Sequence, residues 1–315
     1  MPFILIVLSQ GSRGVEWQAN VRGFTFVRSG DYVNNSLPPP EQRALVQRVT
    51  ALSQRSPTLY DRHVLHIDFA AFGMPRPVYI NLLRDPLRMQ VSAFYFWRAC
   101  VCRTRQAFCA QAWKLASSSS LCKPNYTIDD LYMTANPVPA VGLMTRWFCG
   151  HSDECAGPEP QPLSARQHAL HRALSNMRLE YVWVGVLERL DDSLRLLTAV
   201  LPAFFGGMVV ERSAREHVRP QTNASHYTYA RPTRGTLHKL AIENENDISL
   251  YQHAIELLDC RLERCGFVPN AKSVSSSIDE PQLHGNKQDT AMAMPVMFAN
   301  SAAVHLLRRR RHLGS

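Results

Sequence analysis

The 315-residue sequence lacks several features that would assign it to a common class of protein. No hydrophobic run approaches the ~20 residues of a membrane-spanning helix, and the six apolar residues at 3–8 are also fewer than the ~7 to 15 of a signal-peptide core. We interpret residues 3–8 as a buried first strand, because a turn-like Ser-Gln-Gly-Ser segment follows them. The cysteines do not form the two paired CxxC motifs of a zinc site, so we expect no metal.

Basic residues outnumber acidic ones, 35 to 26, which gives a formal net charge of +9. Four arginines form the run 308–311, and without them the charge falls to +5, so part of the basicity belongs to the end of the chain. The remainder suits a polyanionic partner such as nucleic acid, an anionic membrane surface or a sulfated polysaccharide. No known nucleic-acid-binding module accompanies the basic run, so we do not expect nucleic acid to be the partner.

Eight cysteines and three glycosylation sequons point to the secretory lumen. Disulfide bonds persist in that oxidising compartment, and Asn-X-Ser/Thr triplets are glycosylated only there. The candidate acceptors are Asn34, Asn125 and Asn223. A lumenal location is therefore favoured over a cytosolic one.

Short strands alternate with helices along the chain. The pattern predicts strands at residues 64–69, 78–83 and 181–186, and helices at 15–22, 41–53, 87–98, 163–175, 190–201 and 236–265. This alternation indicates an α/β domain with a mainly parallel sheet and helices on both faces. Residues 100–123 contain four cysteines and are interpreted as an insertion whose cysteine pairing the sequence does not determine. We expect one domain over residues 1–270 and a low-complexity basic tail without fixed structure over 271–315.

The segment VYINLLRDP at 78–86 contains the most informative motif. An arginine at the carboxyl end of a sheet strand, beside the start of the next helix, can hold a phosphate with its guanidinium fork while the helix supplies free N–H groups. Arg84 occupies that place, and Ser92, two helical turns further on, could donate a hydroxyl to the same anion. The alternative is an ordinary strand end at which Arg84 pairs with Asp85 or another neighbour.

Together with five further blocks, this motif resembles the uronyl and heparan sulfate 2-O-sulfotransferases, which use the sulfate donor PAPS. The blocks are YDRHV at 60–64, DFAAFG at 68–73, FCGHSDEC at 148–155, VGVLE at 184–188 and LPAFF at 201–205, and the resemblance covers roughly residues 22–266. It implies a P-loop-like sulfotransferase fold and transfer of a sulfuryl group from PAPS to the 2-hydroxyl of a uronic acid in heparan, dermatan or chondroitin sulfate. It also implies a trimeric Golgi lumenal protein with type II topology, whose membrane anchor is not visible in this chain.

The resemblance also implies roles for single residues. His63 matches the catalytic base, and an imidazole with a reference pKa near ~6.5 is able to take the proton of a sugar hydroxyl. Without the resemblance, a structural histidine at a strand edge is the better interpretation, as it is for His66. Arg84 and Ser92 match the residues that bind the 3′-phosphate. Arg219 lies in a segment similar to the loop that closes over the nucleotide, although a solvated basic loop is an equal alternative. Cys149 and Cys155 match a short disulfide loop.

The start of the chain departs from the family pattern. In the family a lysine-containing loop after the first strand cradles the 5′-phosphosulfate. Here that loop is residues 9–14, with Gly11, Ser12 and Arg13 as the residues that would bind, and Ser9 stands where the lysine would be. No lysine precedes Lys114, and the planar fork of Arg13 is not an equivalent point charge. Two interpretations follow: the first segment is a shortened or altered version of the family's, or the chain is a catalytically impaired glycosaminoglycan-binding homologue.

Overall fold

The computed structural model describes residues 4–8, 19–29, 36–104, 121–133, 142–156, 162–207 and 230–269. Within these residues a five-stranded sheet has the order β2-β3-β1-β4-β5, and every pair of neighbouring strands is parallel. The strands are β1 (Ile4–Leu8), β2 (Thr25–Arg28), β3 (Thr58–Asp61), β4 (Val78–Leu83) and β5 (Tyr181–Val186). The predicted first strand is thus confirmed, and it lies in the centre of the sheet.

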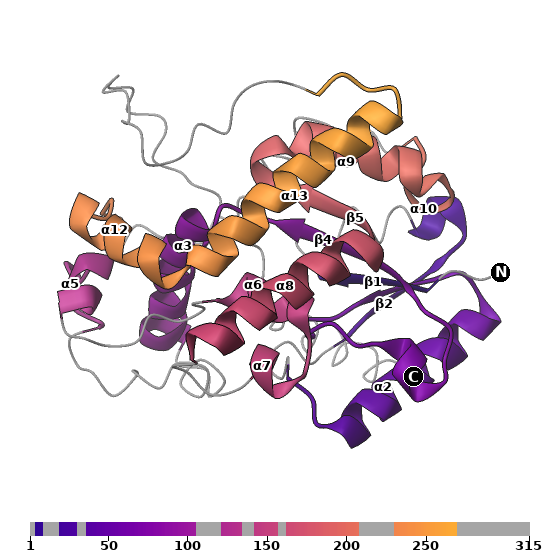
Figure 1. The fold of residues 1–315 in the computed structure, drawn as a ribbon, viewed down its shortest axis with the longest axis horizontal. Helices are drawn as coiled ribbons and strands as arrows, with labels where there is room; N and C mark the ends of the chain where they lie inside the picture. Colours follow the sequence, from indigo (N-terminus) through magenta and orange to yellow (C-terminus); the bar gives the residue numbers. More distant parts are fainter. Residues whose placement is uncertain are drawn as a thin grey trace, which may run out of the picture.

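Helices cover both faces of this sheet. Figure 1 shows α9 (Leu190–Val200) and α10 (Pro202–Phe205) on one side and α2 (Pro39–Arg55) on the other. The remaining helices in the described part are α3 (Pro86–Ala99), α5 (Ile128–Met133), α6 (Leu143–Cys149), α7 (Asp153–Ala156), α8 (Leu163–Leu179), α12 (Arg234–Glu243) and α13 (Glu245–Arg264), with 3-10 turns η1 (Phe69–Phe72) and η3 (Leu187–Arg189). The α/β prediction is confirmed, whereas the P-loop segment at 9–14 lies outside the described residues.

A β-bulge in β5 sends its aromatic side chains to opposite faces. Tyr79 of β4 pairs with Tyr181, but the next residue, Ile80, pairs with Trp183, which leaves Val182 as an extra residue. Tyr181 stacks beside Tyr79, with ring centroids 5.2 Å apart. The indole N–H of Trp183 instead donates to the Ser193 carbonyl of α9 at 2.8 Å.

Helix α13 lies along the outer edge of β5. The guanidinium of Arg261 donates to the carbonyl oxygens of Tyr181 at 2.8 Å and Val182 at 2.9 Å, at the bulge itself. Burial lowers the pKa of Arg261. Two carbonyls that have no strand partner among the described residues are therefore satisfied by a side chain of α13.

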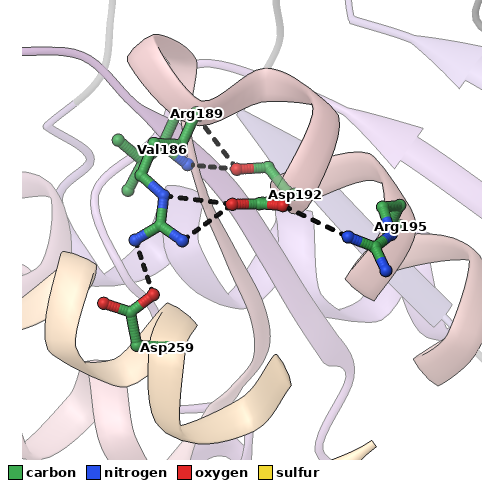
Figure 2. A network of polar contacts seen from close by, with 6 residues as sticks. Val186, Arg189, Asp192, Arg195 and Asp259 are labelled. Carbon is green, nitrogen blue, oxygen red and sulfur yellow. Dashed lines mark hydrogen bonds and ion pairs between the residues drawn. The ribbon is translucent and has the colours of Figure 1, made fainter. Parts of the chain in front are cut away.

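Polar contacts fix the turn that follows β5 (Figure 2). The Ser193 hydroxyl donates to the carbonyl of Val186 at 3.0 Å and accepts from its N–H at 2.8 Å. Arg189 donates to Asp192 at 2.7 Å and also to Asp259 of α13. Burial alone would lower the pKa of Arg189, but its hydrogen bonds to the two carboxylates outweigh burial and raise it. Glu188, inside this turn, is thereby held next to the start of α3.

Two predicted elements are wrong. Residues 64–69 do not form a strand: Val64, Leu65 and Ile67 are buried by packing and not by strand pairing, and the strand before them is Thr58–Asp61. The predicted helix at 236–265 is two helices, because Asn244 interrupts it at φ −106° and ψ 23°. The Asn244 side chain donates to the Leu240 carbonyl at 2.9 Å and accepts from Gln90 of α3 at 3.0 Å.

The predicted insertion at 100–123 is described only at its two ends. It begins with a π-helical turn at Cys100–Thr104 and is closed by a Cys102–Cys122 disulfide, with Cα atoms 5.4 Å apart. The buried guanidinium of Arg98 donates to the carbonyls of Leu121 and Pro124. These hydrogen bonds fix the chain where the segment ends. The other predicted helices agree with the structure to within a few residues, except 15–22, of which only residues 19–22 are described.

Candidate active site

The carboxyl ends of β3, β1 and β4 meet at one edge of the sheet. The parallel register places Val7 of β1 level with Asp61 of β3, and Leu8 level with Asn81 of β4. His63 follows β3 by two residues and Arg84 follows β4 by one. The two side chains predicted to act on donor and acceptor therefore follow the strands on either side of β1.

This arrangement is a topological switch point. The chain leaves β1 toward β2 on one side of the sheet and later crosses from β3 to β4 on the other side of β1. Ligands of open α/β sheets bind in the crevice at such a point, outside the carboxyl ends of the strands. β1 leads directly into residues 9–14, so Gly11, Ser12 and Arg13 follow the central strand, although their structure lies outside the described residues.

Arg84 lies in a turn that three elements hold in place. Asp85 caps α3, since its Oδ1 accepts the N–H of Arg88 at 2.8 Å. Glu188, from the turn after β5, accepts the N–H of Asp85 at 3.1 Å and the hydroxyl of Tyr251 in α13 at 2.8 Å. Arg84 is only 9% exposed. Its backbone is thus fixed before any ligand arrives.

Ser92 has a hydroxyl that suits a ligand. It lies within α3, is 8% exposed, and has no hydrogen-bond partner in the described part of the chain. Serines inside helices often donate back to a carbonyl one turn earlier, as Ser249 does to Glu245 at 2.9 Å. A nearly buried hydroxyl without such a bond fits an external acceptor such as a phosphate oxygen.

His63 is buried at the same edge, with 4% exposure. Its ring centroid lies 6.1 Å from that of Trp147 in α6. Two residues earlier, the buried Asp61 carboxylate pairs with Arg28 at the end of β2, at 3.4 Å. The imidazole therefore lies beside an aromatic ring near the switch point, where the predicted general base would meet an acceptor.

His66 has a different environment from a catalytic base. Burial lowers its pKa to about 4; Asp68 opposes that shift, and Arg172, His151 and Arg76 add to it. Its ring lies 4.9 Å from that of Tyr79 and 6.0 Å from that of Tyr181. A neutral imidazole in an aromatic cluster fits the interpretation of His66 as structural.

Cys149 and Cys155 form a disulfide bond, as predicted, with Cα atoms 5.4 Å apart. Asn125 is exposed in a turn before α5, as a glycan acceptor must be. Arg219, Asn34 and Asn223 lie outside the described residues. In the part of the chain that the structure describes, His, Cys, Asp and Glu side chains form no group of three that could bind a metal ion. None of the helices described there is both long and apolar enough to cross a membrane.

Sequence reasoning missed Glu188 and Asn176, which connect distant parts of the chain to this site. Glu188 bonds to a residue 103 positions away, and Asn176 of α8 lies 3.4 Å from the Nδ1 of His66, 110 positions away. Neither has a local signal, although Glu188 stands inside the quoted VGVLE block.

The fold and this edge define an α/β protein with a candidate anion-binding site at its switch point. No family model matches the sequence. Among curated proteins, the chain is 32% identical over 232 residues to heparan sulfate 2-O-sulfotransferase 1 of Gallus gallus and 31% to that of Homo sapiens, covering 69% of this chain and 57% of each relative. It is 30% identical over 195 residues to uronyl 2-sulfotransferase of Homo sapiens, covering 62% of this chain and 46% of the relative.

The chain belongs to this family of 2-O-sulfotransferases. It spans a little over half the length of the curated relatives it matches.

Proposed function

We propose that the chain is a PAPS-dependent sulfotransferase that acts on the 2-hydroxyl of a uronic acid in a glycosaminoglycan. The observation that carries the proposal is the fixed Arg84 turn beside β1, with the Ser92 hydroxyl unpaired within the described residues. The names of the relatives, which refer to heparan sulfate and to uronyl groups, support this class of acceptor.

Each candidate residue has a defined role in this proposal. Arg84 and Ser92 bind the 3′-phosphate of the donor, while Gly11, Ser12, Arg13 and Arg219 bind its remaining charged groups. When bound, PAPS supplies an activated sulfuryl group. His63 accepts the proton of the acceptor hydroxyl at a ring nitrogen and holds it there, which raises the nucleophilicity of the acceptor oxygen.

Calorimetric titration with PAP, the desulfated donor, tests the donor site. Arg84→Ala should weaken PAP binding by about 1.5 to 3 kcal/mol, or about 10- to 150-fold, because a charged hydrogen bond to phosphate is lost. Arg55→Ala is a matched control, since Arg55 is exposed at the end of α2 that leads into the amino end of β3. Equal affinity in Arg84→Ala and Arg55→Ala would reject the donor site.

A second function has one observation in its favour. By the resemblance, Ser9 stands where the family has the lysine that stabilises the leaving phosphate. A glycosaminoglycan-binding homologue without turnover would keep the crevice but not the reaction. It would bind PAP or polysaccharide and show no sulfation of any uronic-acid acceptor.

We also propose the family's setting for this chain, a trimer in the Golgi lumen attached to the membrane. Two disulfides in the described residues and the exposed sequon at Asn125 support a lumenal address. Endoglycosidase treatment of the protein expressed in secreting cells tests the lumenal address, because a lumenal chain carries glycans at Asn125.

A further inference from the structure

The segment that follows His63 is hydrogen-bonded to α6 and to the disulfide loop at Cys149–Cys155. The N–H of His66 donates to the carbonyl of Trp147 at 2.8 Å. In return, the carbonyl of His66 lies 3.2 Å from Nδ1 of His151, inside the loop. Both the backbone N–H and the carbonyl of His66, three residues after His63, are thus hydrogen-bonded.

Asn176 of α8 is hydrogen-bonded to the start of the loop. Its amide donates to the carbonyls of Phe148 at 2.8 Å and Cys149 at 3.3 Å, and the same nitrogen lies 3.4 Å from Nδ1 of His66. One amide therefore connects the start of the disulfide loop with the segment that follows His63.

Gly150 shows how closely the two segments approach. It has φ 109° and ψ −148°, a backbone conformation that essentially only glycine adopts. A Cβ at this position would lie 2.9 Å from the carbonyl oxygen of His66, which is closer than real Cβ contacts. A side chain here would have to push the His66 backbone away.

We infer that the Cys149–Cys155 loop and Asn176 are positioning groups for His63. This inference rests on the proposed function, in which His63 is the base. The loop sets the main chain at His66, and the intervening residues Val64 and Leu65 are buried and cannot absorb a shift freely. A displacement of about 1 Å at a reacting group can cost about 100-fold in rate.

The first test is Gly150→Ala. We expect kcat to fall about 10- to 100-fold while PAP affinity changes less than about twofold, because Arg84 and Ser92 lie on other elements. Gly266→Ala is the control: Gly266 also has a positive φ, 76°, but a Cβ there meets nothing within 4 Å. The control should keep kcat within about twofold of the unmodified chain.

The second test keeps the backbone unstrained. Asn176→Asp replaces the donor with a carboxylate that faces two carbonyl oxygens, so the loop should shift and kcat should fall while PAP affinity is kept. The matched control is Asn246→Asp, since the Asn246 amide likewise donates to a carbonyl, that of Arg166 at 2.9 Å, in the first turn of α8. An equal loss of kcat in Asn176→Asp and Asn246→Asp would overturn the positioning role.

A third readout does not require turnover. The ring C–H signal of His63 in NMR, assigned with His63→Gln, should move in Gly150→Ala and Asn176→Asp and stay in place in the two controls. If the unmodified chain transfers no sulfate, the proposed function fails, but this signal still decides whether the loop places His63. An unmoved signal in both loop variants contradicts the inference.

Discussion

Burial makes His66 a residue whose protonation is coupled to unfolding. Its pKa is lowered to about 4 by burial, while Asp68 opposes the shift and Arg172, His151 and Arg76 add to it. In the unfolded chain the same imidazole takes up a proton near pH ~6.5. Between these values the unfolded state binds more protons than the folded state, so the free energy of unfolding falls as the pH falls from about 6.5 to 4.

We predict that His66 contributes about 3 kcal/mol to this loss, from the difference of about 2.5 pH units. Burial also lowers the pKa of His151, which adds to the slope in the same direction. Urea denaturation at pH 7 and pH 4 measures the effect. His66→Gln should reduce the pH dependence of the free energy of unfolding. His168→Gln, on the exposed face of α8, should leave that pH dependence unchanged. Equal slopes in the two variants would refute the prediction.

At the scale of elements, α13 caps α6, the helix that contains Trp147. Oδ1 of Asp247 in α13 accepts the N–H and the hydroxyl of Thr145, both at 2.7 Å, and Oδ2 accepts the N–H of Met144 at 3.1 Å. The two N–H groups are donors that the first turn of α6 leaves without a partner inside the helix. Burial raises the pKa of Asp247, and the three hydrogen bonds oppose that rise.

Asp247→Ala should lower the free energy of unfolding by about 2 to 4 kcal/mol, because buried donors at the α6 terminus lose a charged acceptor. Glu245→Ala is the comparison on the same helix, since its ion pair with Arg166 at 2.6 Å is largely exposed. Surface pairs of this kind contribute about 1 kcal/mol or less. Chemical denaturation that gives equal losses for the two variants would argue against the cap.

The elements that the sequence predicted are those in which local pattern and final pairing agree. Residues 78–83 and 181–186 are apolar runs bounded by turn residues, and both are strands. The run at 64–69 has the same apolar character but packs against α6 without a strand partner, so composition alone misassigned it. The break at Asn244 depends on Gln90, 154 positions away, which no local pattern reveals.

The residues of the candidate site fall into two similar groups, those that a local motif identifies and those that only long-range contacts identify. The sequence indicates Arg84, Ser92 and His63 as candidates because they stand in linked motifs that follow strands. It does not indicate Asn176 and Glu188, because each acts through contacts between segments more than 100 positions apart. Polar contacts between such distant segments can be predicted only once the order of the strands in the sheet is known.

At the scale of the whole molecule, β3 and β4 end on either side of β1, the strand that leads to Ser9, where the resemblance expects a lysine. We predict that Ser9→Lys increases sulfation of a uronic-acid acceptor, because a point charge at the leaving phosphate stabilises the transition state. His63→Ala in that background should abolish the gain, since general-base assistance is worth roughly 100- to 10,000-fold. A radiolabelled sulfate transfer assay measures both changes. No gain from Ser9→Lys, with PAP still bound, would favour the non-catalytic homologue.

The position of α13 along β5 has a consequence for solubility. An exposed edge strand is a template for pairing with a strand of another molecule, and proteins commonly cover such edges. Here Arg261 occupies the carbonyls of the bulge, while Val182 and Leu179 beside it remain 40% and 75% exposed. Removal of α13 by proteolysis or a premature stop would leave these apolar side chains next to unpaired carbonyls. A fragment without this helix would therefore tend to aggregate through β5 and would not persist as a smaller soluble domain.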